Sequence, residues 1–227
     1  MDEDREDKIA VITRLCVCLF ILQSLCLSAF ASTTDWRWQF CTVDPGKGGS
    51  FGTSATTSDG ADFLDISLPT GRYLNCATYY EQGVGGWTAE TGFYSTDIRS
   101  PLVAQTENTK TWLFYFWGSP SLTSSNMYLT WGYFSDNTPD FQNSVYTLKY
   151  VRPAVGITEG YVDVGTTISL NYHSQGTWKF PAYATTNGLD GYMFELTATV
   201  IPEPASILAL LTGLAGIGGI AIKRRQA

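Results

Sequence analysis

The chain has 227 residues, with 14 Lys or Arg against 21 Asp or Glu, which gives a formal net charge of -7. This acidic balance argues against nucleic acid as a partner, because phosphates are bound by clustered Lys and Arg. With 44% hydrophobic and 14% aromatic residues, the region between the two apolar ends is large enough for one ordinary domain with a real core.

An apolar segment near the N-terminus has the pattern of a secretory signal peptide. Lys8 and Arg14 stand near its start, and the small residues Ala29 and Ala31 close it. Small residues at these two places fit the pocket of a signal peptidase, so we predict that residues 1–31 are removed by cleavage after Ala31. Two details depart from the usual pattern: the stretch before the apolar segment is unusually acidic, and Arg14 lies close to the apolar core. An uncleaved membrane anchor is the alternative.

Two cysteines remain after the signal peptide, Cys41 and Cys76. Both fall in segments with a strand pattern, and an exported protein meets an oxidising compartment. We therefore predict a disulfide that closes a loop of about 35 residues and adds roughly 3 to 4 kcal/mol to the free energy of unfolding. Two buried free thiols are the alternative.

Apolar and polar residues alternate with a period of two along much of the domain predicted at 32–200, which indicates strands with one buried face. The alternating segments are 36–40, 64–68, 73–79, 146–150, 168–172 and 194–198. Two runs, 111–117 and 127–134, are apolar on both faces and indicate central strands. No long helical pattern lies between these segments. The sequence therefore predicts an all-β fold, an antiparallel β-sandwich or jelly roll of about nine to eleven strands.

Two short stretches gather oxygen-bearing side chains. They are Asp59, Asp62 and Asp65 in one, and Asp136, Asn137 and Asp140 in the other. Calcium binds oxygen ligands of this kind and often joins loops in extracellular proteins, so it is the one metal that we consider. Neither stretch matches an EF-hand loop, and acidic residues also serve in turns without any metal. No other cofactor is indicated.

Little in the sequence indicates catalysis. His173 is the only histidine, so a histidine-dependent mechanism would rest on one residue. Residues 48–52 match the G-x-S-x-G spacing of hydrolases, but no helical pattern follows Ser50, which favours a flexible loop. A polysaccharide hydrolase needs two carboxylates at a set separation. Its candidates are Glu81, Glu90, Glu159 and Glu195, and no pair among them is distinguished by the sequence. We expect no enzymatic activity.

Two tryptophans, Trp87 and Trp178, follow glycine-containing stretches that are typical of loops. The flat apolar face of a tryptophan can stack on a sugar ring, which makes a carbohydrate-binding module an alternative function. Packing inside the sandwich is the competing role for both residues, because a sandwich core also needs large aromatic side chains.

The C-terminal segment 201–227 contains three elements in a fixed order. They are the motif Pro202, Glu203 and Pro204, the uncharged apolar run 205–222, and the basic triplet Lys223, Arg224 and Arg225. At about 1.5 Å per residue the run reaches roughly 27 Å, which is enough to cross the hydrocarbon core of a bilayer. We predict a transmembrane helix whose basic end stays in the cytoplasm while the domain lies outside.

This order resembles a PEP-CTERM sorting signal, the tag that an exosortase reads in Gram-negative bacteria that make exopolysaccharide. The resemblance covers only about residues 201–225. It implies that a cysteine-dependent membrane transpeptidase processes the tail and releases the protein to the surface; a plain membrane anchor is the alternative. The two prolines prevent the helix from extending upstream and leave an extended peptide that an enzyme could bind.

The sequence therefore predicts an exported β-sandwich protein that is held transiently by its tail and then delivered to the cell surface or the exopolysaccharide matrix. A structural or interaction protein is the first hypothesis. A carbohydrate-binding module with exopolysaccharide as a partner is the second, and a polysaccharide-acting hydrolase is the third.

Overall fold

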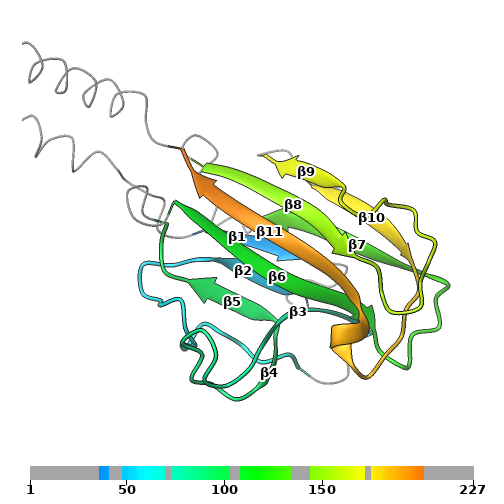
Figure 1. Cartoon of the computed structure of the whole chain (residues 1–227), viewed down its shortest axis with the longest axis horizontal. Helices are drawn as coiled ribbons and strands as arrows, with labels where there is room; N and C mark the ends of the chain where they lie inside the picture. Colours follow the sequence, from blue (N-terminus) through cyan, green and yellow to red (C-terminus); the bar gives the residue numbers. More distant parts are fainter. Residues whose placement is uncertain are drawn as a thin grey trace, which may run out of the picture. The chain divides into compact units, whose positions relative to one another are not determined.

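The computed structural model describes residues 36–40, 48–69, 73–102, 108–133, 144–171 and 175–201. Within them, eleven strands form two sheets that pack face to face (Figure 1). The predicted all-β sandwich is confirmed. Among these residues no helix has the length and apolar character needed to cross a membrane. The helices predicted for the signal peptide and for 205–222 lie outside the described residues.

The five-stranded sheet has the order β10-β7-β1-β2-β5, and the six-stranded sheet has the order β4-β3-β6-β11-β8-β9. The strands of the first sheet are β1 (Trp36–Phe40), β2 (Gly49–Thr53), β5 (Thr96–Arg99), β7 (Asn126–Tyr133) and β10 (Gly176–Pro181). Those of the second are β3 (Leu74–Tyr80), β4 (Gly92–Tyr94), β6 (Thr109–Gly118), β8 (Ser144–Arg152), β9 (Thr167–Leu170) and β11 (Tyr192–Val200). A short 3₁₀ helix, η1 (Gly188–Asp190), precedes β11.

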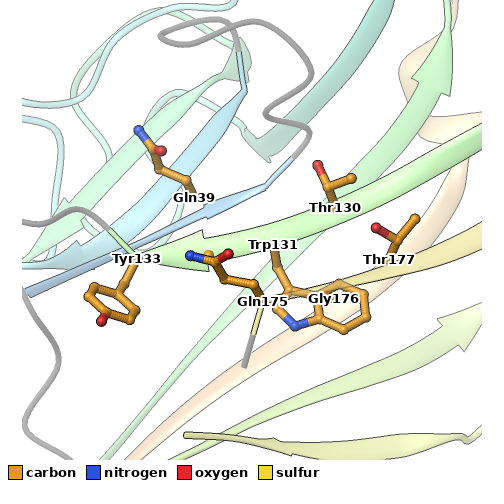
Figure 2. A pocket seen from close by; sticks show the side chains of 8 residues that line it. Gln39, Thr130, Trp131, Tyr133, Gln175, Gly176 and Thr177 are labelled. Atoms are coloured by element: carbon orange, nitrogen blue, oxygen red, sulfur yellow. The ribbon is translucent and has the colours of Figure 1, made fainter. Parts of the chain in front are cut away.

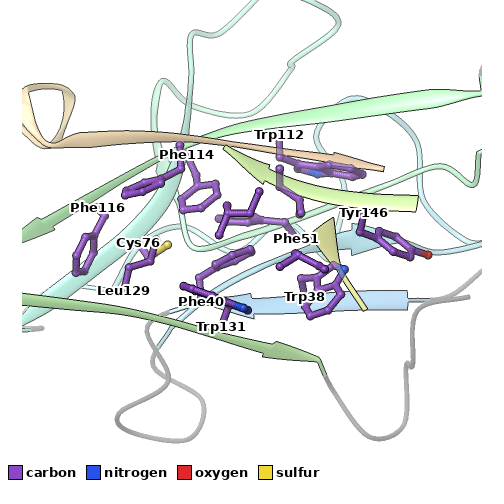
Figure 3. Close-up of a cluster of buried hydrophobic side chains, with 14 of the residues drawn as sticks. Trp38, Phe40, Phe51, Cys76, Trp112, Phe114, Phe116, Leu129, Trp131 and Tyr146 are labelled. Carbon is purple, nitrogen blue, oxygen red and sulfur yellow. The ribbon is translucent and has the colours of Figure 1, made fainter. Parts of the chain in front are cut away.

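The core lies between the two sheets and is rich in aromatic side chains (Figure 3). Strand β1 turns Trp36, Trp38 and Phe40 inward, and none of them is more than 1% exposed. The ring of Trp36 meets Trp112 of β6 edge to face at 5.4 Å, and the rings of Phe40 and Phe114 lie 4.7 Å apart. Because the partners come from different sheets, these ring contacts join the two layers.

Most of the strand predictions are confirmed. Segments 36–40, 146–150 and 194–198 lie in β1, β8 and β11, and their apolar residues face the core. The alternating segments at 73–79 and 168–172 correspond to β3 and β9. Strand β9 shows the alternation that a period of two produces, whereas β3 is buried at four consecutive positions, 75–78, and does not alternate.

The two runs predicted to be central strands do lie inside their sheets, as β6 and β7. Their outer faces are only partly covered, however. Leu113 of β6 and Tyr128 of β7 are 43% and 44% exposed. Leu113 and Tyr128 therefore face solvent, so the two-sided pattern indicates a place within the sheet but not burial along the whole of both faces.

The prediction of a strand at 64–68 is wrong. This segment makes an isolated bridge between Ser67 and Tyr94, and Ile66 is 54% exposed. Ile66 and Thr96 of β5 also exchange backbone hydrogen bonds of 3.2 and 3.3 Å. The segment therefore covers the outer edge of β5, which would otherwise present unpaired backbone groups.

One strand pair departs from the predicted antiparallel arrangement. Strands β2 and β5 run parallel, with Ser50 opposite Thr96 and Thr53 opposite Arg99. Parallel neighbours need a long crossover connection. Here the chain between them passes through β3 and β4 of the other sheet, which supplies that crossover.

The residues that match G-x-S-x-G are not the predicted loop. Residues 49–53 form β2, which is buried along its whole length. Strand β1 approaches β2 so closely that a Cβ atom on Gly52 would lie 1.9 Å from the carbonyl oxygen of Trp36. The motif therefore reflects close strand packing, and only glycine fits at position 52.

We expect Gly52→Ala to lower the free energy of unfolding by about 3 kcal/mol or more, because the added methyl group must displace the β1 backbone. Gly92→Ala is the matched control in a strand, because no heavy atom lies within 4 Å of its added Cβ. Urea unfolding followed by tryptophan fluorescence measures both variants. Equal stability of the two proteins would contradict the close approach of β1 and β2.

Candidate functional site

A shallow polar depression lies on the five-stranded sheet and crosses three of its strands (Figure 2). Its volume is about 430 Å³. Strand β1 contributes Gln39, and β7 contributes Thr130, Trp131, Gly132 and Tyr133. Strand β10 contributes Gly176 and Thr177, and Gln175 directly precedes it. We call this depression the polar trough.

Gly132 lies at the centre of the polar trough because of the strand register. Gln39 of β1 is directly opposite Gly132. On the other side, Gln175 directly precedes Gly176, which pairs with Trp131. A Cβ atom on Gly132 would meet Gln175 Cγ at 3.9 Å. The two glutamine side chains therefore flank a position that has no side chain of its own.

The polar trough is on the outer side of the sheet. Figure 2 shows Gln39, Thr130 and Thr177 on one side of the strands, while Trp131 and Tyr133 point to the other. This follows from the alternation of side chains along a strand, since the neighbours of Gln39 in β1 are buried in the core. The inward aromatic residues thus fix the direction of the outward polar ones.

The chemistry of the polar trough is that of neutral hydrogen bonding. Each glutamine amide offers both donors and an acceptor, and a threonine hydroxyl offers one donor and acceptor sites. In the part of the chain that the structure describes, the amides of Gln39 and Gln175 form no hydrogen bond with the protein. No charged residue is among the lining residues. The arrangement suits a neutral ligand with many hydroxyl groups.

Trp178 lies next to the polar trough but on the inner side of β10. It is half-buried, and its ring meets that of Trp131 at 5.2 Å with an interplanar angle of 68°. Trp178 also packs against the core cluster. The structure therefore places this candidate for sugar stacking beneath the sheet, beside the core, and sugar stacking by Trp178 stays a prediction.

Trp87 occupies a different place from the one that its loop sequence suggests. It is 2% exposed. Its ring stacks on Tyr80 at 4.2 Å with an interplanar angle of 13°, and Tyr94 meets it edge to face at 4.5 Å. This arrangement fits the packing role and not sugar stacking, because the ring presents no open face to a ligand.

A buried cluster of charged and polar side chains joins β5 to the other sheet. The carboxylate of Asp97, which is 2% exposed, accepts hydrogen bonds from the Tyr80 hydroxyl and from Nε and Nη2 of Arg99, the latter two at 3.2 Å. Arg99 Nη1 donates to the Thr111 carbonyl at 2.8 Å, and the guanidinium lies 4.9 Å from the Trp112 ring centroid. The cluster thus links β3, β5 and β6.

The pKa values of this cluster indicate a structural role. Burial alone would lower the pKa of Arg99, but the charge of Asp97 raises it above its ordinary value. Burial and the same carboxylate raise the pKa of Tyr80. Arg99 therefore stays charged and Tyr80 stays protonated, so that both donate to Asp97 throughout the physiological pH range.

We expect Asp97→Asn to lower the free energy of unfolding by about 3 to 5 kcal/mol, because Arg99 is left buried without a counter-charge. The double variant Asp97→Leu with Arg99→Met removes both charges and should recover most of that loss. Urea unfolding at neutral pH compares the two proteins. A double variant no more stable than the single one would show that charge pairing is not what the cluster contributes.

The aspartates considered as calcium ligands accept hydrogen bonds from other groups of the protein. Asp59 accepts hydrogen bonds from the Lys110 ammonium and from the Ser100 backbone N–H and hydroxyl, the last at 2.6 Å. Burial alone would raise the pKa of Asp59, but these hydrogen bonds and the Lys110 charge hold it below its ordinary value. Asp59 therefore joins a loop to the start of β6.

Asp62 and Asp65 also serve the local backbone. Asp62 accepts from the Leu64 N–H at 2.9 Å, and Asp65 accepts from the N–H groups of Asp62 at 3.0 Å and of Ile98 at 2.9 Å. No group of three or more metal-ligating side chains occurs in the described ranges. These bonds fit the turn role of the aspartates. The second stretch, Asp136 to Asp140, lies outside the described residues.

The pH dependence of stability should depend on Asp65. Burial raises its pKa from 3.8 to about 7, against the effect of the two backbone N–H groups and with a further contribution from the charge of Asp97. Between these pH values the folded chain keeps a proton that the unfolded chain releases, so the free energy of unfolding falls as the pH rises from about 4 to 7.

We expect Asp65→Asn to flatten the stability profile in this pH window, because the side chain no longer titrates. Urea midpoints at half-unit pH intervals measure the profile. Glu159→Gln, which changes an exposed carboxylate, is the control and should leave the profile unchanged. Parallel profiles of the wild type and Asp65→Asn would overturn the assignment.

The carboxylates considered for glycoside hydrolysis lie in three different elements. Glu81 and Glu90 are in the loop between β3 and β4, Glu159 is in the loop between β8 and β9, and Glu195 is in β11. Glu195 faces away from the core, between two inward residues. Only Glu81 and Glu90 share an element, and none of the four carboxylates lines the polar trough.

Several predicted sites fall outside the described residues: Ala29 and Ala31, Cys41, His173, the motif Pro202 to Pro204, and the basic triplet Lys223 to Arg225. Cys76 is described and is fully buried in the core. The disulfide stays a prediction.

No protein-family model, curated protein or solved structure matches this chain. The functional assignment therefore rests on the residues and on the geometry of the sandwich. Sequence reasoning missed Gln39, Gly132 and Gln175, the residues that define the polar trough. The outward direction of Gln39 follows from the alternation in β1, but the register that places it opposite Gly132 is not visible in either segment alone.

Proposed function

We propose that this chain is an exported structural or interaction protein of the cell surface or the exopolysaccharide matrix, processed at its tail by an exosortase-type transpeptidase. The observation that carries the proposal is the order of the tail: Pro202, Glu203 and Pro204, then the apolar run 205–222, then a basic end. Strand β11 supports it, because β11 ends at Val200. A processing motif that begins two residues later can be cut without loss of a strand.

In this proposal the two ends act in sequence. The signal peptide directs export and is removed after Ala31, and the apolar run then holds the protein in the membrane until the tail is processed. The basic triplet keeps the far end of the run in the cytoplasm. The sandwich is the part that acts at the surface, and membrane attachment is temporary.

A carbohydrate-binding module is the second candidate, and the polar trough favours it. Two amides and two threonines line an uncharged depression on a solvent-facing sheet surface, and such groups match the hydroxyls of a sugar. Exopolysaccharide is the corresponding partner. A polysaccharide hydrolase finds less support, since none of its candidate carboxylates lines the polar trough.

We expect replacement of Pro202, Glu203 and Pro204 by alanine to leave the protein in the membrane with its tail uncut, because the transpeptidase loses its recognition motif. The experiment uses a Gram-negative host that forms exopolysaccharide and carries an exosortase. Cell fractionation and immunoblotting follow the mass and the location. The control replaces the exposed loop residues Thr158, Glu159 and Gly160 by alanine and should be processed like the wild type. Unchanged processing of the motif variant would leave a plain anchor as the explanation.

A further inference from the structure

The face that carries the polar trough continues along β7 and β10 as a row of polar and aromatic side chains. Lys179 is paired with Tyr128, and Thr177 is paired with Thr130. Alternate residues of a strand share a face, so Thr177 and Lys179 of β10 project on the same side as Gln175. Tyr128 is 44% exposed there.

The loop between β8 and β9 adds a tyrosine to the far end of this row. The Lys179 ammonium lies 4.3 Å from the centre of the Tyr161 ring, and the Tyr161 hydroxyl donates to Asn126 Oδ1 at 3.1 Å. Tyr161 is nevertheless 60% exposed. Because the cation covers one face of the ring, the opposite face is the one available to a ligand. Figure 1 shows the loop passing beside β10.

We propose that these residues form a binding site for a linear, neutral glycan that lies along the β7–β10 pair. We call it the glycan strip: Gln39, Gln175, Thr177, Tyr128, Lys179 and Tyr161. The inference rests on the second candidate function, and it adds the path of the glycan, its charge class and the roles of the residues.

The dimensions of the glycan strip set the size of the ligand. Positions 128 and 132 of β7 are four residues apart, which at about 3.3 Å per residue gives roughly 13 Å, room for about two or three sugar rings in a row. Tyr161 extends the strip beyond the Tyr128 end. The ligand is therefore a short stretch of a chain and not a single sugar.

The charges favour a neutral glycan over an acidic one. Lys179 is the only charged member of the glycan strip, and its ammonium already lies on the Tyr161 ring. The chain as a whole has a net charge of -7, which repels a polyanion at a distance. Lys179 is therefore a positioning residue that orients Tyr161. The ring supplies the stacking face, and the two glutamines supply hydrogen bonds to hydroxyls.

The experiment uses the full chain in a detergent without a sugar headgroup. The probes are linear neutral hexasaccharides of glucose, mannose, galactose and N-acetylglucosamine, together with a polyuronate hexasaccharide as the acidic probe. Isothermal titration calorimetry measures the affinity. We expect binding of at least one neutral probe in preference to the acidic probe. Tyr161→Ala should weaken that binding by roughly two- to tenfold, which corresponds to the loss of one aromatic stacking contact.

Four further variants make the test specific. Tyr161→Phe keeps the ring and should bind like the wild type, whereas Gln39→Ala with Gln175→Ala should bind more weakly. Lys179→Met should fall between the wild type and Tyr161→Ala. Tyr73→Ala is the matched control, because Tyr73 is 67% exposed but outside the glycan strip. Affinities are compared only among variants whose urea midpoint of unfolding equals that of the wild type.

Three results would overturn the proposal: no binding of any neutral hexasaccharide at 10 mM, stronger binding of the acidic probe, or equal losses in Tyr73→Ala and Tyr161→Ala. None of these results would contradict the sorting proposal, because tail processing is measured separately, in cells, from the mass and location of the protein. Conversely, unchanged processing of the Pro202 to Pro204 variant would contradict the sorting proposal but not the proposed glycan binding, which is measured in vitro.

Discussion

Packing of aromatic rings between the two sheets is the interaction on which the rest of this structure depends. Trp36 and Phe40 of one sheet meet Trp112 and Phe114 of the other, so each layer is held in place by the rings of its partner. The outer surface follows from this inner one. Gln39 points to solvent because its two neighbours in β1 are buried in the core, and the polar trough is therefore built on a rigid base.

A second constraint arises at the β5 edge of the five-stranded sheet. β5 is held there by a parallel pairing to β2 and by the Asp97–Arg99 ion pair, which reaches β6 of the other sheet. Its outer edge is covered by the segment at 64–68, in which a carboxylate of Asp65 takes the place of a backbone carbonyl opposite Ile98. Asp65, which the sequence offered as a calcium ligand, thus helps to cover the outer edge of β5. A covered edge protects the chain from pairing with another copy.

The alternating pattern predicted the fold because most strands have one face in the core, as 36–40 and 194–198 show. The same pattern failed at 64–68, where backbone bonds to β5 and the turn formed by the aspartates prevailed over local alternation. Trp87 could not be placed from its glycine-containing loop, since its burial depends on Tyr80 of another segment. The polar trough was out of reach for a similar reason: Gln39, Gly132 and Gln175 are brought together by register across three strands.

The place of β11 has a consequence for the order in which the protein can be made. β11 is the last of the described strands along the chain, yet it lies inside the six-stranded sheet between β6 and β8. A chain that crosses a membrane with its N-terminus first cannot complete this sheet until Val200 has emerged. The next residues to arrive are those of the Pro202 motif. If the chain is exported in that way, the sheet closes only as the tail reaches the membrane, and under the proposed function a processing enzyme would act on a domain that has just closed. A chain truncated before β11 would lack a central strand.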